Sequence, residues 1–77
     1  MSINNNEIDF ILEMVQERIA KNEEIQSGNF QIVQNELLEG FHDTELIRNS
    51  LIKIDQTRYA ITVLAELVVT LEGFKIA

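Results

Sequence analysis

The sequence predicts an all-α protein: a helical hairpin or three-helix bundle with a long C-terminal helix, whose core is completed by homodimerisation. Apolar residues recur at spacings of three and four along most of the chain, which is the period of an amphipathic helix. Proline is absent, and the three glycines lie where these apolar patterns stop. A chain of 77 residues forms a single domain with a small core, and oligomerisation is a common way to stabilise such a core.

The first helix is expected over residues about 6–26. Asparagines at positions 4–6 provide side-chain oxygens that can cap its N-terminus. Ser27 and Gly28 follow the last apolar residue, and a glycine often ends a helix. The buried stripe of this helix is expected to consist of Ile8, Ile11, Leu12, Val15, Ile19 and Ile25.

A short second helix is expected over residues about 30–39. Gly40 is placed to end it, and Asp43 or Thr44 is placed to cap the helix that follows. Its apolar side is expected to consist of Phe30, Ile32, Val33 and Leu37.

The third helix is expected over residues about 44–72, a stretch without proline or glycine. Gly73 is placed to end it in a Schellman motif, with Phe74 packed back on Val69. The apolar period is near 3.5, as in a supercoiled helix. The positions that follow this period are Ile47, Leu51, Ile54, Ile61, Leu64, Val68 and Leu71.

Residues 61–71 also allow a different interpretation. They are rich in β-branched side chains, which favour strands. We prefer the helix, because no second strand or hairpin turn is available to pair with such a strand.

The predicted helix lengths indicate a homodimer. At 1.5 Å per residue, the second helix would be about 17 Å long and the third about 43 Å. The third would then project beyond the first, exposing the apolar residues 59–71, and a helix that is apolar nearly all round needs a cover. We expect a second copy to cover it through an interface of Tyr59, Ile61, Leu64, Leu67, Val68 and Leu71.

Composition excludes several classes of function. The net charge of −7 and the 6 scattered basic residues argue against binding nucleic acid by direct phosphate contact. The absence of cysteine excludes disulfides and thiolate metal sites. The longest uncharged apolar stretches are too short to span a membrane, and residues 1–6 do not resemble a signal peptide. We therefore expect a cytoplasmic protein.

Motifs for catalysis are largely missing, so we expect no enzymatic activity and no cofactor. Glu39 and His42 have the Glu-x-x-His spacing of di-iron bundles. A glycine interrupts this short match at a predicted helix end, and the predicted core faces carry no carboxylates to complete the site. We interpret Glu39 and His42 as surface residues and expect no metal site.

Acidic residues on the polar side of the first helix form a candidate partner-binding face, made of Glu13, Glu17 and Glu24. Such a face could dock on a basic groove, or it could serve solubility alone. Arg58 has the phase of the third helix's apolar seam, where it would pair with an acid across a dimer or extend its head to water.

The function that best fits these observations is a small acidic protein-binding module, a regulator or inhibitor of a larger protein partner. The alternative is a structural oligomerisation or assembly subunit without a separate partner site.

Overall fold

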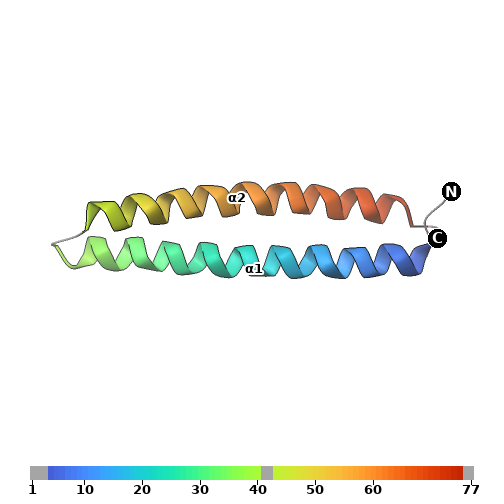
Figure 1. The fold of residues 1–77 in the computed structure, drawn as a ribbon, viewed down its shortest axis with the longest axis horizontal. Coiled ribbons are helices and arrows are strands. Elements are labelled where there is room, and N and C mark those ends of the chain that lie inside the picture. The colour runs from blue at the N-terminus through green and yellow to red at the C-terminus, as the bar shows by residue number, and fades with distance from the viewer. Residues whose placement is uncertain (1–3, 41–42, 76–77) are drawn as a thin grey trace.

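Two helices pack side by side in opposite directions in the computed structural model, which describes residues 4–40 and 43–75 (Figure 1). Helix α1 spans Asn5–Leu38 and helix α2 spans Thr44–Gly73. The hairpin is 58 Å long and 15 Å wide. The start of α1 and the end of α2 lie at the same end of the hairpin (Figure 1). The predicted all-α class is confirmed, in its hairpin form.

The predicted helix boundary at Ser27 and Gly28 is wrong, because α1 continues through both residues. A glycine inside a helix costs only about 1 kcal/mol relative to alanine. Asn29, directly after Gly28, is half-buried, so the contact with α2 continues past the glycine. We attribute the unbroken helix to this packing, which outweighs the local preference of one residue.

The predicted overshoot of the C-terminal helix is also wrong. With 34 residues in α1 and 30 in α2, the two helices have similar lengths and run alongside each other (Figure 1). Residues 61–71 lie within α2, so the strand interpretation is wrong as well.

The contact between the helices follows alternating spacings of three and four residues, the pattern of a coiled coil. We call these positions the seam. All of its residues are buried or half-buried. On α1 the seam consists of Ile8, Leu12, Val15, Ile19, Asn22, Gln26, Asn29, Val33 and Glu36; on α2 it consists of Ile47, Ser50, Ile54, Thr57, Ile61, Leu64, Val68 and Leu71.

The seam is apolar near the chain ends and more polar near the connection. The core cluster of Ile8, Leu12, Val15 and Leu71 is at most 8% exposed. Partly buried hydrophobic residues of both helices pack against it. Toward the connection, asparagine, glutamine, serine and threonine occupy many of the seam positions. The hydrophobic stabilisation of the hairpin is therefore concentrated in its terminal half.

Side chains cap the start of both helices. Asn4 caps α1, and its side-chain oxygen accepts a hydrogen bond from the backbone N–H of Glu7 at 2.8 Å. Gly40, directly after α1 and its C-cap, has a φ of 75°, a left-handed conformation that glycine adopts at little cost. The predicted cap region and the predicted end at Gly40 are both confirmed.

Asp43, one of the two predicted candidates, caps α2 by accepting hydrogen bonds from the backbone N–H groups of Glu45 and Leu46 at 3.0 and 3.1 Å. We expect Asp43→Ala to lower the free energy of unfolding by about 1 kcal/mol, because both donors lose their side-chain acceptor. Urea denaturation followed by circular dichroism measures this loss. Asp43→Asn should recover most of it, and Asp55→Ala, at an exposed mid-helix position, should have little effect. Equal losses in the alanine variants would contradict the capping role.

The C-terminal end of α2 differs from the predicted Schellman motif. Gly73 is the last helical residue and does not have a positive φ, and Phe74 adopts a right-handed helical conformation as the C-cap. Phe74 is 60% exposed. The helix end is closed instead by hydrogen bonds from the backbone N–H of Phe74 to carbonyl oxygens of the last turn.

An ion pair joins the two ends of the described chain. Lys75 Nζ lies 2.6 Å from Asp9 Oδ1, and this hydrogen bond raises the pKa of Lys75 above its usual 10.5. The pair therefore stabilises the fold below pH 10.5, and this contribution is lost as the pH rises through the raised pKa. Both side chains are partly exposed, so the stabilisation is small.

Candidate interaction surface

The six residues predicted to form a dimer interface divide into two groups. Four of them are seam residues that face α1: Ile61, Leu64, Val68 and Leu71. The other two are exposed, Tyr59 by 74% and Leu67 by 40%. The predicted short second helix does not exist, and the longer α1 covers these four residues, for which the sequence analysis predicts a second copy as cover.

A different set of apolar residues remains uncovered along one side of the hairpin. Each seam residue has a neighbour that directly precedes it in the sequence. In an antiparallel helix pair, the preceding neighbours of both helices lie on the same side of the seam. These residues and their outer neighbours one turn away form what we call the side face. Its large apolar residues, half-buried or exposed, are Ile11, Met14, Ile25 and Ile32 on α1 and Leu46, Val63, Leu67 and Phe74 on α2.

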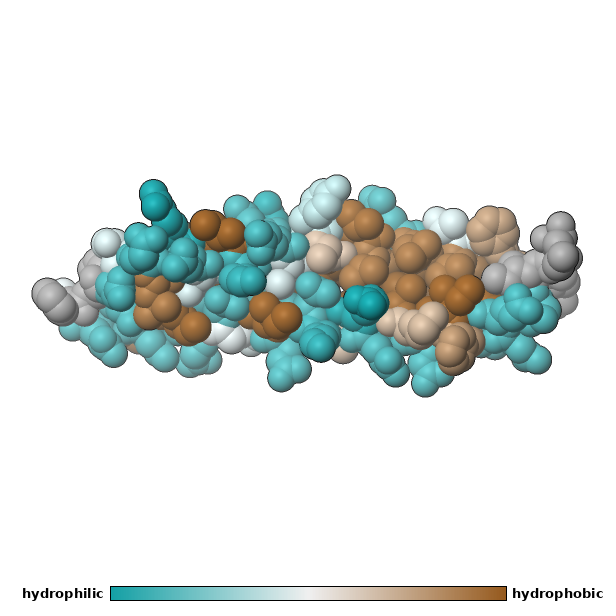
Figure 2. Space-filling model, in the orientation of Figure 1, coloured by the Kyte–Doolittle hydropathy of each residue, from teal (hydrophilic) through white to brown (hydrophobic). Residues whose placement is uncertain are grey.

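The apolar surface is most continuous near the chain ends. Figure 2 shows an apolar patch that crosses both helices in the terminal half of the hairpin. Toward the connection, apolar residues are separated by hydrophilic ones (Figure 2). Large contiguous apolar patches on a protein surface commonly mark an interaction site.

The charges of the side face differ from those of the chain as a whole. The chain carries 13 acidic residues and has a net charge of −7. At the side-face positions, the acidic residue is Glu7, near the start of α1, and the basic residues are Arg18, Lys21 and Lys53. The side face is therefore apolar to weakly basic in an acidic molecule.

The acidic residues singled out from the sequence share one stripe on the outer surface of α1. With 100° of rotation per residue, Glu13, Glu17 and Glu24 lie within about 40° of one another around the helix axis. All three are exposed. We call them the acidic stripe.

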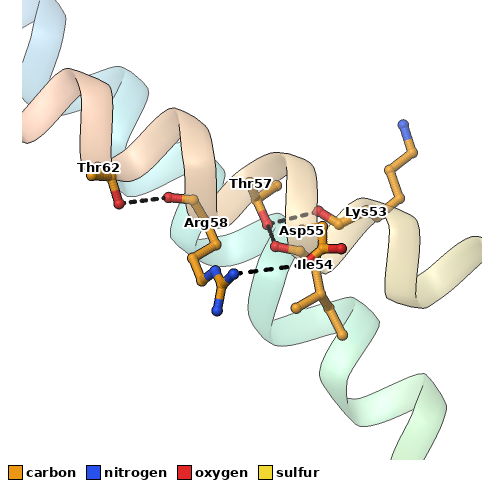
Figure 3. A network of polar contacts seen from close by, with 6 residues as sticks. All are labelled: Lys53, Ile54, Asp55, Thr57, Arg58 and Thr62. Carbon is orange, nitrogen blue, oxygen red and sulfur yellow. Dashed lines mark hydrogen bonds and ion pairs between the residues drawn. The ribbon is translucent and has the colours of Figure 1, made fainter.

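Arg58 lies outside the seam, contrary to the predicted phase, because Thr57 occupies the seam position. The Thr57 hydroxyl donates to the carbonyl oxygens of Lys53 and Ile54 in its own helix (Figure 3). The Arg58 side chain is 76% exposed and lies 4.0 Å from Asp55 of the same helix (Figure 3). This exposed pair adds little stability and leaves no buried charge in the seam at this point.

A groove of about 550 Å³ opens beside the polar part of the seam, on the side opposite the side face. Its lining residues are Glu23, Gln26, Ser27, Phe30 and Ile54. Phe30, expected in the core, is 55% exposed. Five apolar residues from Ile25 to Leu37 are predicted to face inward. The prediction is wrong for four of them, which are exposed: Ile25, Phe30, Ile32 and Leu37. It holds for Val33, which is half-buried in the seam.

The seam asparagines hydrogen-bond to their own helix, and among the described residues they form no hydrogen bond across the seam. The side-chain amides of Asn22 and Asn29 donate to the carbonyl oxygens of Arg18 and Ile25, each at 2.8 Å. The double substitution of Asn22 and Asn29 by leucine should therefore raise the free energy of unfolding, by about 1–2 kcal/mol for each added apolar contact. Urea denaturation at a fixed protein concentration measures the increase.

The matched control is Gln31→Leu, which changes an exposed amide side chain of the same helix outside both the seam and the side face. Its stability should stay within about 0.5 kcal/mol of the wild type. A double variant no more stable than this control would contradict the seam position of the two asparagines.

Two carboxylates near the Glu-x-x-His match, those of Glu36 and Asp43, contact backbone N–H groups at the start of α2. Glu36 is half-buried and accepts a hydrogen bond from the backbone N–H of Asp43 at 3.0 Å, and Asp43 caps α2. Glu39 is exposed, and His42 lies outside the described residues. Within residues 4–40 and 43–75, no group of three or more potential ligands is placed to hold a metal ion.

Neither helix, over the part of the chain that the structure describes, has an apolar stretch long enough to cross a membrane. Comparisons with protein-family models, with curated proteins and with solved structures find no significant match. The surfaces described above are therefore the basis for any functional proposal.

Proposed function

We propose that the protein is a small, acidic, non-enzymatic protein-binding module that acts as a homo-oligomer and regulates or inhibits a larger protein partner. The observation that carries this proposal is the excess of exposed apolar surface. In the described residues, four hydrophobic side chains are buried, whereas fifteen large ones are exposed. A helix pair with so small a core and so much apolar surface gains stability from a protein partner.

The acidic stripe is the surface that we assign to the larger partner. Its three carboxylates lie on the side of α1 that faces away from α2, so a partner can reach them while the side face is covered. A row of like charges on a rigid helix favours a partner with a basic groove, and such docking depends on salt concentration.

Immobilised protein tests this assignment with extracts of the native host at low and at moderate salt. We expect the wild type to retain a partner at low salt and release it as the salt concentration rises. The triple variant Glu13→Gln, Glu17→Gln and Glu24→Gln should keep its helicity, because exposed charges contribute at most about 1 kcal/mol each. It should lose most of the retained partner.

The control variant carries Glu39→Gln, Glu66→Gln and Glu72→Gln, which change the net charge equally at exposed positions outside the stripe. It should retain the partner nearly as well as the wild type. If the stripe variant binds the same partner with unchanged salt dependence, the assignment of the acidic stripe is wrong.

An assembly subunit without a separate partner is the second candidate function. It is favoured by exposed apolar residues on the side opposite the side face, where Phe30, Leu37 and Leu51 are 50–59% exposed. Two apolar sides allow one chain to contact more than one neighbour. Such a subunit would form larger oligomers as its concentration rises, with little dependence on salt.

A further inference from the structure

We propose that a second copy of this chain covers the terminal half of the side face in reversed orientation, with the two helix connections at opposite ends of a four-helix bundle. The two-fold axis crosses α2 at Leu67, so the terminal halves of the two hairpins overlap. This inference rests on the homo-oligomer of the proposed function and adds the contact surface, the orientation and the register of the copies.

The apolar residues of the side face are most continuous in the terminal half. Ile11 and Met14 of α1 and Val63, Leu67 and Phe74 of α2 belong to this half. There the apolar surface crosses both helices (Figure 2). A two-fold dimer uses the same patch on both copies. A second copy therefore offers an apolar surface of the same extent.

Contacts inside the hairpin define which residues of the two helices lie at the same height. Three such contacts are the groove lined by Gln26 and Ile54, the hydrogen bond between Glu36 and Asp43, and the ion pair between Asp9 and Lys75. Residues of α1 and α2 therefore lie level when their numbers add up to about 81. By this relation Leu67 of α2 lies level with Met14 of α1.

The charges of the side face pair with one another in this register. In the reversed dimer α1 lies over α1 of the partner subunit, the two run in opposite directions, and the axis passes Met14. Glu7 and Lys21 share the helical phase of Met14, each seven residues away from it, so Glu7 lies opposite Lys21 of the partner subunit. The two-fold axis produces two such pairs, one at each edge of the apolar contact. Both side chains are exposed, and neither takes part in an ion pair between described residues.

The apolar side chains of α2 also fit one another in size. Phe74 and Ala60 are each seven residues from Leu67, so Phe74 lies opposite Ala60 of the partner subunit. Phe74 is 60% exposed in the single hairpin, and the small side chain of Ala60 leaves room for its ring. At the axis Leu67 meets Leu67 of the partner subunit.

Other reversed registers bring like charges together. An axis at Ala60, which would overlap the hairpins over most of their length, places Lys21 opposite Lys21 of the partner subunit. An axis at Val63 places Arg18 opposite Arg18 of the partner subunit. Like charges that meet in a contact are costly, so both registers are disfavoured.

A parallel dimer is disfavoured for the same reason. Its two-fold axis runs along the hairpin, so Lys53 lies opposite Lys53 of the partner subunit. Glu7 then lies level with the end of α2 and away from the basic residues of the side face. In the proposed register Lys53 lies beyond the end of α2 of the partner subunit, outside the contact.

The experiment compares disulfide formation in full-length Leu67→Cys, Ala60→Cys and Thr62→Cys under mild oxidation by diamide. The chain contains no cysteine, so each introduced thiol reports on one position. A disulfide requires Cβ atoms about 3.5–4.5 Å apart, and in the proposed register Ala60 lies about 20 Å along the bundle from its own copy. Thr62 is exposed on α2 away from the side face and serves as the matched control. We expect Leu67→Cys to form a linked dimer at least 10-fold faster than either other variant, as read on a non-reducing gel.

The rate of Ala60→Cys distinguishes the other arrangements. A parallel dimer places Ala60 and Leu67 equally far from their own copies, because the two residues share one helical phase, so both variants would link at similar rates. Faster linking of Ala60→Cys would indicate a reversed dimer with the axis at Ala60. Either result would overturn the proposed register and leave the homo-oligomer standing.

Exchange of the paired charges tests the register independently. Lys21→Glu replaces two attractions by two repulsions and should raise the dissociation constant at least about 3-fold, as measured by analytical ultracentrifugation. Adding Glu7→Lys restores opposite charges and should return the constant to within about twofold of the wild type. Lys53→Glu, the matched control, makes the same charge change outside the contact and should have little effect. A double variant as weak as Lys21→Glu alone would overturn the register.

Two further results would reject the contact itself. Linking of Thr62→Cys at the rate of Leu67→Cys, or no linking in a chain that sediments as a dimer, would overturn the side face as the contact. A wild-type chain that sediments as a monomer would overturn both this inference and the homo-oligomer.

Discussion

Leu12→Ala is expected to unfold most of the protein at 25 °C. Leu12 is 5% exposed and belongs to a core cluster of four residues. Truncating a buried leucine to alanine costs about 2–5 kcal/mol, and a core of this size seldom supplies more than about 3–5 kcal/mol in total. Circular dichroism at a fixed protein concentration should show a large loss of helicity.

Leu38→Ala makes the same chemical change at a residue that is 84% exposed. This control should keep the helicity and the urea midpoint of the wild type. If Leu12→Ala denatures at the same urea concentration as the wild type, the seam near the chain ends is not what holds the two helices together.

Leu67→Glu is expected to weaken self-association by at least about 100-fold. Burying one leucine is worth about 1.5–3 kcal/mol, a two-fold interface contains the residue twice, and 1.4 kcal/mol changes a dissociation constant tenfold. Leu67 is outside the core cluster, so the substitution should weaken the contact between copies and leave the core intact. Any helicity lost on dissociation should therefore return as the protein concentration is raised. Analytical ultracentrifugation over a concentration series measures the dissociation constant.

Val69→Glu provides the matched control for this prediction. Val69 is an apolar residue of the same helix, is 72% exposed and points away from the side face. Its substitution should leave the dissociation constant within about twofold of the wild type. Equal weakening by both substitutions would mean that the contact lies elsewhere or that any added acid disrupts the assembly.

The terminal half of the hairpin could be predicted from the sequence because its seam is apolar. Ile8, Leu12 and Val15 recur at the helical period, and the structure buries all three. The bounds of α2 and the cap at Asp43 were predictable for a similar reason, since a capping side chain acts within one turn of sequence.

The half near the connection could not be predicted from apolar residues alone. There the residues at the seam spacing are polar: Asn22, Gln26 and Asn29. The apolar residues beside them, Ile25 and Phe30, lie outside the seam and are exposed. Gly28, three residues after Ile25, has the local preference of a helix end. The spacing of three and four from Ile19 through these polar residues to Val33 was the available signal.

The candidate surfaces were predictable only in part. Glu13, Glu17 and Glu24 share one stripe because helix periodicity alone places them there. Which apolar residues of α2 remain uncovered depends on which positions of α2 α1 contacts. These contacts extend along α2 because α1 is one continuous helix, and the sequence analysis divides it in two. Two of the six residues expected at the interface, Tyr59 and Leu67, remain exposed, and Leu67 belongs to the side face.

Sedimentation equilibrium of the wild-type chain at low micromolar concentration tests the central claim, that a second copy covers the side face. We predict a mass of two chains, twice 8.9 kDa, with little change as the salt concentration rises, because the contact is apolar. A mass of one chain, measured on protein whose helices are fully formed, would contradict the claim.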